Sequence, residues 1–168
     1  AALIGLIVFV ALMLMAIFAP WIAPHNPSDQ FRDNLLQPPA WQQGGSWQFI
    51  LGTDDVGRDM LSRVIFGARA SLLVGTSVVA CAGTFGVLLG LFAGYKGGRT
   101  DAIIMRLVDI QVAFPGLLLV LLIMSVVGPS TVTLIVVLAL TNWMIYARVV
   151  RSIVLSIRQS AFVEAAEM

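Results

Sequence analysis

The chain has little charge and few of the side chains that carry chemistry. Only 11% of its 168 residues are charged, and it contains one cysteine and one histidine. A soluble globular domain has about a quarter of its residues charged, so this depletion argues against a soluble class. Cys81 cannot form an internal disulfide, and His25 has no neighbours at the spacing of a metal site. We expect no metal site and treat His25 as a loop residue.

Motifs for catalysis and nucleotide binding are also missing. Residues 94–98 are rich in glycine, but they lack the spacing and the Lys-Ser/Thr end of a phosphate loop. The three aspartates at 54, 55 and 59 lack the alternation and final glutamate of a calcium loop, so helix capping is the better interpretation. A net charge of +1 without a basic, aromatic-rich patch argues against nucleic acid. We therefore expect no enzyme activity and no cofactor on this chain.

Long apolar runs dominate what remains. The sequence is 59% hydrophobic, with a mean hydropathy of +0.95. A membrane-spanning helix needs about 20 mostly apolar residues. Four runs meet this criterion, at residues 2–21 (in a first segment, 1–22), 71–95, 102–127 and 131–147. Apart from Arg106 and Asp109, these runs hold no charged side chain, which predicts four spans in an all-α integral membrane protein.

The start of the chain allows a second interpretation, a secretory signal peptide. Such a peptide has a basic start and a short apolar core, whereas no charge occurs between Ala1 and Pro24. A membrane span fits better. Because the sequence starts without Met inside an apolar run, we expect it to be a fragment of a longer protein.

The longest connection, residues 23–70, joins the first two runs. Its first part is rich in Pro, Asn, Gln and Gly and has no period for a buried element. Its second part has an apolar stripe, which predicts a short interfacial helix near residues 58–67 with caps at 53–55. The next two connections are shorter. Residues 128–130 predict a tight helical hairpin, with Ser130 or Thr131 as the cap of the helix that follows.

Lysine and arginine density predicts the orientation of the spans. The turn after the second run has Lys96 and Arg99, and the tail after the fourth has Arg148, Arg151 and Arg158. Four arginines lie in the long 23–70 loop, where five aspartates accompany them. The positive-inside rule therefore puts the turn and the tail (148–168) in the cytoplasm and the 23–70 loop outside.

Two features of the runs suggest roles. Four small residues recur every fourth position of the second run: Ala82, Gly86, Gly90 and Gly94. Their strict register favours close helix packing over the general abundance of glycine in membrane helices. Pro115 interrupts the third run and is either a hinge or a static kink. Arg106 and Asp109 lie three residues apart, so a local ion pair, or one to a neighbouring helix, is expected near the inner interface.

Several segments together resemble the inner-membrane permeases of dipeptide/oligopeptide-type ABC importers. These segments are residues 51–63, 67–72, 93–98, 105–109, 113–115 and 164–166. The resemblance implies a six-span, MetI-like permease fold in a bacterial or archaeal cell membrane, of which four spans lie in this fragment. It implies a second homologous permease, two cytoplasmic ATP-binding subunits and an extracytoplasmic substrate-binding protein as partners, beside the lipid bilayer. It also implies that Glu164, Ala165 and Ala166 begin the segment that docks on an ATP-binding subunit.

The resemblance leaves the substrate open. Permeases of this type also serve nickel and other small solutes, and no residue of this chain separates those substrates from peptides. A structural or signalling membrane subunit without a transport pathway is the alternative from another class. A membrane enzyme is the third, and the empty set of catalytic groups disfavours it.

Overall fold

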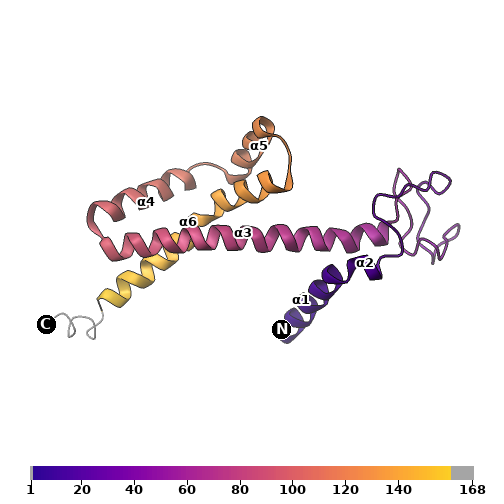
Figure 1. The fold of residues 1–168 in the computed structure, drawn as a ribbon, viewed down its shortest axis with the longest axis horizontal. Coiled ribbons are helices and arrows are strands. Elements are labelled where there is room, and N and C mark those ends of the chain that lie inside the picture. The colour runs from indigo at the N-terminus through magenta and orange to yellow at the C-terminus, as the bar shows by residue number, and fades with distance from the viewer. Residues whose placement is uncertain (1, 160–168) are drawn as a thin grey trace. The chain divides into compact units, whose positions relative to one another are not determined.

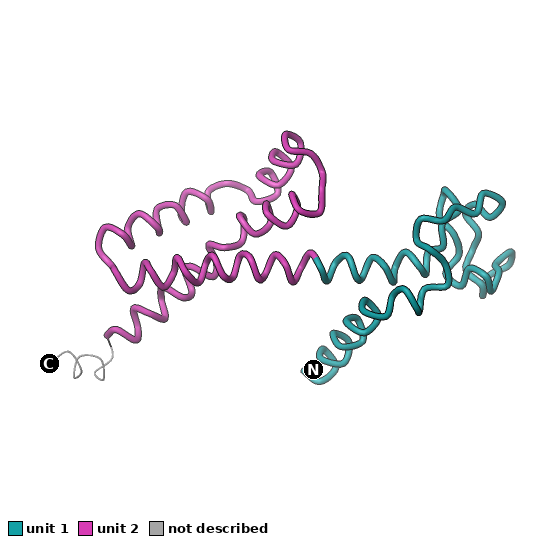
Figure 2. The backbone as a smooth tube through the Cα atoms, in the orientation of Figure 1, with its two compact units in different colours: residues 1–73 teal, residues 74–168 magenta. Residues whose placement is uncertain are grey.

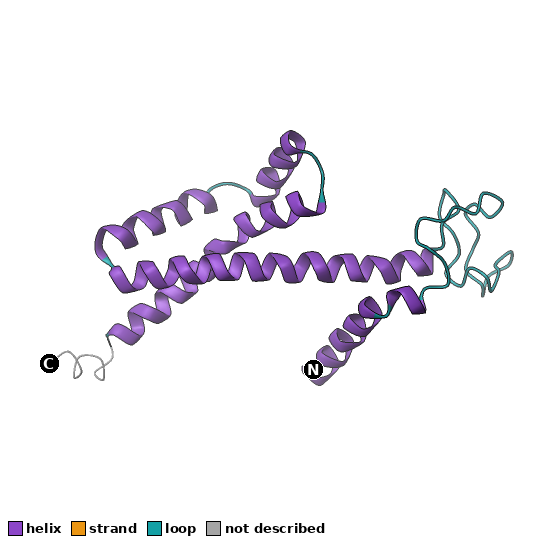
Figure 3. Ribbon diagram, viewed as in Figure 1, coloured by secondary structure: helices purple, strands orange, loops and turns teal. Residues whose placement is uncertain are grey.

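Residues 2–159 are described by a computed structural model, in which regular structure is helical (Figures 1 and 3). Within this part of the chain, strand-type pairing is limited to one isolated bridge between Thr53 and Asp59. Residues 1–73 and 74–168 form two compact units (Figure 2). The helices are α1 (Ala2–Ile17), α2 (Ala19–Ile22), α3 (Met60–Lys96), α4 (Gly98–Val112), α5 (Gly116–Val127) and α6 (Thr131–Arg158).

The first apolar run forms two helices, which corrects the prediction of one unbroken span. α1 ends at Ile17, and α2 begins at Ala19 with Pro20 in its first turn. Proline has no backbone N–H to donate to the carbonyl four residues earlier, and its ring clashes there. The helical pattern therefore breaks at Phe18. α1 alone is about 24 Å long at 1.5 Å per residue, which is shorter than a hydrocarbon core of about 30 Å.

α3 is one continuous helix of 37 residues, about 55 Å long at 1.5 Å per residue. Residues 60–67 are helical, as predicted, but they belong to the same helix as the second apolar run and are not a short element of their own. That this part lies at the membrane interface stays a prediction. The sequence changes from polar to apolar near residue 70, but no proline or left-handed glycine interrupts the helical backbone hydrogen bonds there. The cap is Asp59, one of the three aspartates predicted to cap, and not a residue of 53–55: its carboxylate accepts a hydrogen bond from the Ser62 backbone N–H at 3.1 Å.

The third apolar run is sharply broken at Pro115. α4 and α5 meet at an angle of 84°, so the run predicted as one span over 102–127 is broken at the proline where a kink was expected, and the pair stays a candidate for a single span. Pro115 cannot donate to the Gln111 carbonyl, and the Phe114 N–H uses that carbonyl in a tighter turn at 3.1 Å. α4 also begins at Gly98, before the predicted start, because Gly97 and Gly98 turn the chain with φ of 62° and 53°.

α6 extends the fourth run into the basic tail. Ser130 is its cap, as one of the two predicted residues, with its hydroxyl accepting from the Thr133 N–H at 3.0 Å. The helix continues for 28 residues, about 42 Å, and so includes the three arginines after residue 147. α3 and α6 are each long and apolar enough to span a membrane, and the α4–α5 pair adds a third candidate. The full set of four spans stays a prediction.

Candidate functional site: the contact of α3 and α4 with α6

Three glycines of α3 lie directly against α6, Gly86 and Gly90 against its backbone and Gly94 against the Val154 side chain. A Cβ atom on Gly86 would lie 2.3 Å from the Trp143 carbonyl oxygen, and one on Gly90 would lie 2.5 Å from that of Ala147. One on Gly94 would lie 2.7 Å from the Val154 Cβ. These distances are far below ordinary carbon–oxygen and carbon–carbon contacts, so no side chain fits at these positions. The predicted small-residue stripe thus faces α6 of the same chain.

The order of these contacts fixes the relative direction of α3 and α6. Successive glycines of α3 meet successively later residues of α6, so the two helices run in the same direction. The guanidinium of Arg158 donates to the Tyr95 carbonyl oxygen at 3.1 Å, at the C-terminal ends of both. The basic turn after α3 and the basic end of α6 therefore lie at the same end of this unit, as the charge distribution predicts.

α4 completes the packing on the far side of this contact. A buried cluster joins the three helices and consists of Ala82, Val108, Trp143 and Ala147. The Trp143 ring also meets the Phe85 ring edge-to-face, with 5.4 Å between centroids. Ala82, the first residue of the stripe, is 1% exposed and lies in this cluster. The core of this unit therefore sits where α3, α4 and α6 meet.

Gln111 ties the end of α4 to α6 just before the break. Its side-chain oxygen accepts from the Trp143 indole N–H at 2.8 Å, and its side-chain N–H donates to the Leu140 carbonyl oxygen. Gln111 lies four residues before Pro115, so these bonds fix the position of α4 beside the bend. Sequence reasoning missed this contact, although a glutamine in a largely apolar run was a visible signal.

Two ion pairs hold α4 beside the basic part of α6. Arg151 binds Asp101 through two hydrogen bonds, and Arg148 lies 3.1 Å from Asp109. The ion pair expected between Arg106 and Asp109 is therefore replaced by the interhelical alternative. Both partners of the Arg148–Asp109 pair are more than half exposed, so this pair positions the helices more than it stabilises them.

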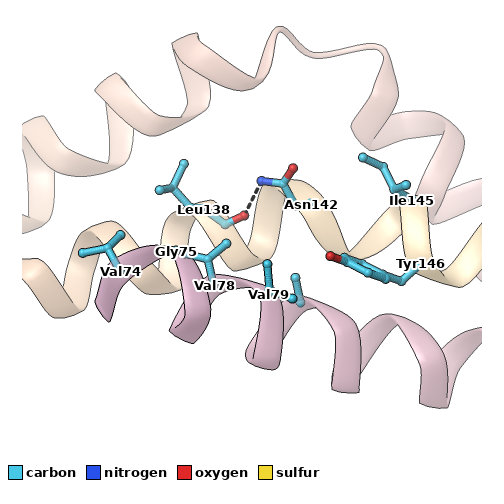
Figure 4. A pocket seen from close by; sticks show the side chains of 9 residues that line it. Val74, Gly75, Val78, Val79, Leu138, Asn142, Ile145 and Tyr146 are labelled. Atoms are coloured by element: carbon cyan, nitrogen blue, oxygen red, sulfur yellow. Dashed lines mark hydrogen bonds between the residues drawn. The ribbon is translucent and has the colours of Figure 1, made fainter. Parts of the chain in front are cut away.

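A cavity of about 310 Å³ opens beside the glycine contact (Figure 4). Its lining comes from α3 and α6: Val74, Gly75, Val78, Val79, Ala82, Leu138, Asn142, Ile145 and Tyr146. The Asn142 side chain donates to the Leu138 carbonyl oxygen at 2.7 Å, within its own helix. Apart from Asn142 and Tyr146, the lining residues are apolar, so the cavity suits a mostly apolar group.

The 23–59 loop has a polar core of its own in the other unit. The buried Asp59 carboxylate accepts from the Ser62 hydroxyl at 2.5 Å and lies 3.5 Å from the His25 ring nitrogen. The His25 ring also packs on Phe31 and Phe49, with centroids 5.1 Å and 5.3 Å away. His25, expected to be an ordinary loop residue, therefore helps to hold the loop on the start of α3.

Asp54 closes the turn that precedes this core. Its carboxylate accepts from the backbone N–H groups of Val56 and Arg58 and pairs with the side chains of Arg58 and Arg63. Burial alone would raise the pKa of Asp54, but the hydrogen bonds from Arg58 and Val56 outweigh it and lower the pKa to about 2. Asp54 is therefore a fixed anion in a turn, and Asp59 is the residue that caps α3.

Of the other predicted site residues, the structure describes Pro115 but not the docking residues. Pro115 stands at the start of α5, where its backbone is extended at ψ 116° and the bend is complete. Whether it acts as a hinge stays a prediction. Glu164, Ala165 and Ala166, the predicted docking residues, lie outside the described residues. What the structure describes is α6, which leads to them.

Known proteins resemble the chain over nearly its whole length. It is 44% identical to the di/tripeptide transport system permease protein DppC of Pseudomonas aeruginosa over 99% of the chain and 55% of that protein. It is 51% identical to the Escherichia coli K12 dipeptide transport system permease protein DppC over 92% of the chain and 51% of that protein. The Bacillus subtilis dipeptide permease DppC is 39% identical over 99% of the chain and 50% of its own length.

Family comparison agrees with these relatives. Residues 86–168 match the family described as binding-protein-dependent transport system inner membrane component. The chain belongs to this family. Residues 1–39 match the N-terminal transmembrane domain of oligopeptide transport permease C. The glycine contact, Gln111 and both interhelical ion pairs lie within the range that matches the transport permease family. The chain spans about half the length of the curated relatives it matches.

Proposed function

We propose that this chain is part of the permease subunit of an ATP-driven importer for di- and oligopeptides. The observation that carries the proposal is the agreement of the two family matches with relatives named as dipeptide permeases, over nearly the whole chain. The family consists of transport components, so ATP hydrolysis is assigned to separate partner chains. The proposed location is the bacterial plasma membrane, with several passes.

The proposed mechanism is alternating access, in which α6 links the membrane to the ATP-binding partners. α6 is one unbroken helix from Thr131 to Arg158, and residues 164–166 follow it after a few positions. The close glycine contacts from α3 and the ion pairs from α4 hold its final turns. A movement of the docking segment would therefore reach α3 and α4 through α6, and favour one arrangement of the spans over another.

The proposed partners follow from the same mechanism. A second homologous permease would complete the pathway, two cytoplasmic ATP-binding subunits would drive it, and an extracytoplasmic binding protein would deliver the peptide. Glu164 would supply a polar contact to the ATP-binding subunit, and Ala165 and Ala166 would permit close approach.

The test is substitution of Ala165 in the full-length permease, assembled with its partners in proteoliposomes. Ala165→Arg is expected to abolish uptake of a labelled dipeptide while the permease still inserts and the ATP-binding subunits still hydrolyse ATP. Ala165→Ser is the matched control, because it keeps a small side chain and should retain uptake. Normal uptake by the Ala165→Arg complex would refute the docking role.

Substrate class is tested in the same proteoliposomes. Uptake of labelled dipeptide that excess unlabelled dipeptide abolishes, and excess nickel does not, is the expected result. The names of the relatives favour the peptide. Nickel uptake that peptides fail to inhibit would point to the alternative, and growth on peptides independent of this gene would point to a non-transport subunit.

A further inference from the structure

The outward face of α4 carries two arginines that bind no other described residue. α4 presents Ile104 and Val108 to the packed core, and Asp101 and Asp109 to the arginines of α6. Arg99 and Arg106 are both exposed. Within residues 2–159, neither arginine side chain makes an ion pair or a hydrogen bond.

These arginines share one stripe with apolar side chains. At 100° per residue, positions 99, 103, 106, 107 and 110 fall within about 100° of the helix circumference. Ile103, Leu107 and Ile110 are 62%, 54% and 51% exposed. A hollow lined by Ala102, Ile103, Arg106 and Leu107 lies on this stripe. We call Arg99, Ile103, Arg106, Leu107 and Ile110 the outer stripe of α4.

The ion pairs fix the depth of the outer stripe. Asp101 and Asp109 bind Arg151 and Arg148, which follow the uncharged part of α6 that ends at Ala147. Arg106 lies between those two aspartates along α4. The outer stripe is therefore level with the basic boundary of α6, where the hydrocarbon core gives way to lipid headgroups.

We propose that the outer stripe of α4 binds an anionic phospholipid. The lipid phosphate would accept hydrogen bonds from Arg99 and Arg106, and the first part of an acyl chain would lie on Ile103, Leu107 and Ile110. Charge complementarity carries the assignment: the stripe has two cations, no anion, and both aspartates of α4 are committed to α6. Arginine forms planar, paired hydrogen bonds to phosphate, and basic residues at this depth attract acidic lipids.

The test uses the full-length permease complex and phosphatidylglycerol as the probe. Native mass spectrometry would count retained lipid, and vesicle titrations would compare phosphatidylglycerol with phosphatidylcholine. The double variant Arg99→Gln/Arg106→Gln should lose affinity for phosphatidylglycerol roughly fivefold per arginine, because each basic residue near an anionic surface contributes to that extent. Phosphatidylcholine binding should be weak and unchanged.

The matched control is Arg32→Gln/Arg69→Gln. It removes the same charge from two exposed arginines in the other compact unit, whose side chains likewise make no ion pair or hydrogen bond within the described residues. This control should retain phosphatidylglycerol binding. Equal loss in both double variants would reduce the effect to net charge and overturn the proposal.

Other occupants give different results. A photo-crosslinker at Ile103 should capture lipid; capture of the second permease or of another part of this chain would overturn the proposal. If exchanging Arg99 with Glu164 or with Glu167 restores what the single charge change at Arg99 disrupts, the partner of Arg99 is a glutamate of this chain and not a lipid, and the proposal is overturned. Inorganic phosphate should not compete with the vesicles, and full competition would assign the site to free phosphate. None of these outcomes depends on peptide uptake, so they stand apart from the transport proposal.

Discussion

Different kinds of interaction stabilise the two compact units, each within itself. In the 23–59 loop, hydrogen bonds and rings join residues far apart in sequence, such as His25, Asp59 and Ser62. In the helical unit, Gly86, Gly90 and Gly94 have no side chains, and this lets α3 approach α6 closely. Asp59 and Ser62 are buried, where water does not satisfy polar groups, so they need specific hydrogen-bond partners. Helices in lipid gain little from further burial of apolar surface, so close backbone approach provides the stabilisation.

The largest effect is expected where a side chain would enter the glycine contact. Gly86→Ala would place a Cβ 2.3 Å from the backbone oxygen of Trp143, which neither helix can relieve by a rotamer change. We expect the free energy of unfolding to fall by an amount in the upper part of the roughly 1–3 kcal/mol range for overpacking. Denaturant unfolding of the full-length permease in detergent, followed by circular dichroism, measures it.

Gly75→Ala is the matched control on the same helix. A Cβ there meets nothing within 4 Å, so the expected result is a neutral change or a gain of about 0.5–1 kcal/mol from the loss of glycine's flexibility. Opposite signs for the two variants would establish that contact, and not glycine content, stabilises this unit. Equal effects would contradict the comparison.

The second largest effect is expected in the polar core of the loop. Asp59→Ala would remove the acceptor of the Ser62 hydroxyl and backbone N–H and leave buried donors unpaired. We expect a loss of about 2 kcal/mol, from unpaired buried groups and a lost helix cap together. Hydrogen exchange at the Ser62 amide should accelerate.

Asp55→Ala provides the control, because Asp55 is exposed and its side chain makes no hydrogen bond or ion pair within the described residues. Its expected effect is within about 0.5 kcal/mol. If Ser62 exchanges equally fast in both variants, the Asp59 network does not hold the loop on α3.

A smaller effect is expected at Gln111, where the helical unit uses polar contact. Gln111→Leu would remove the hydrogen bonds to Trp143 and to the Leu140 carbonyl. Interhelical hydrogen bonds in membranes average about 0.6 kcal/mol each, so a loss near 1 kcal/mol is expected. In a variant that keeps Trp143 as its only tryptophan, the emission maximum should also shift. Thr141→Val, which removes a bond within one helix, should leave that emission unchanged; a shift there alone would argue against the Gln111 contact.

Sequence reasoning succeeded where the signal is local. The four-residue spacing of Gly86, Gly90 and Gly94 and the Ser130 cap are readable from neighbouring positions. The bond between His25 and Asp59 is not, because it joins residues 34 positions apart. The proline alone indicated a kink without its size, because a bend of 84° also involves where α5 packs, which is against α6. Near residue 70, a change in composition separated a short helix from a span in the prediction, whereas the structure joins them in one helix.

The smallest effect over the working pH range is expected at Asp54. Its pKa is lowered from 3.8 to about 2 in the folded loop, so the charged carboxylate stabilises the fold. That stabilisation is complete above about pH 4 and disappears as the pH falls through about 2.

Protonation of Asp54 should therefore leave the resistance of the 23–59 loop to proteolysis unchanged between pH 7 and pH 4.5. Below pH 4 it should fall more steeply in the wild type than in Asp54→Asn, which has no proton to gain. Asp55→Asn should follow the wild type. If proteolysis resistance falls equally with pH in Asp54→Asn and in the wild type, the backbone conformation and not the Asp54 charge holds the turn. The loop would then depend less on polar side-chain partners, and would differ less from the glycine-packed helices.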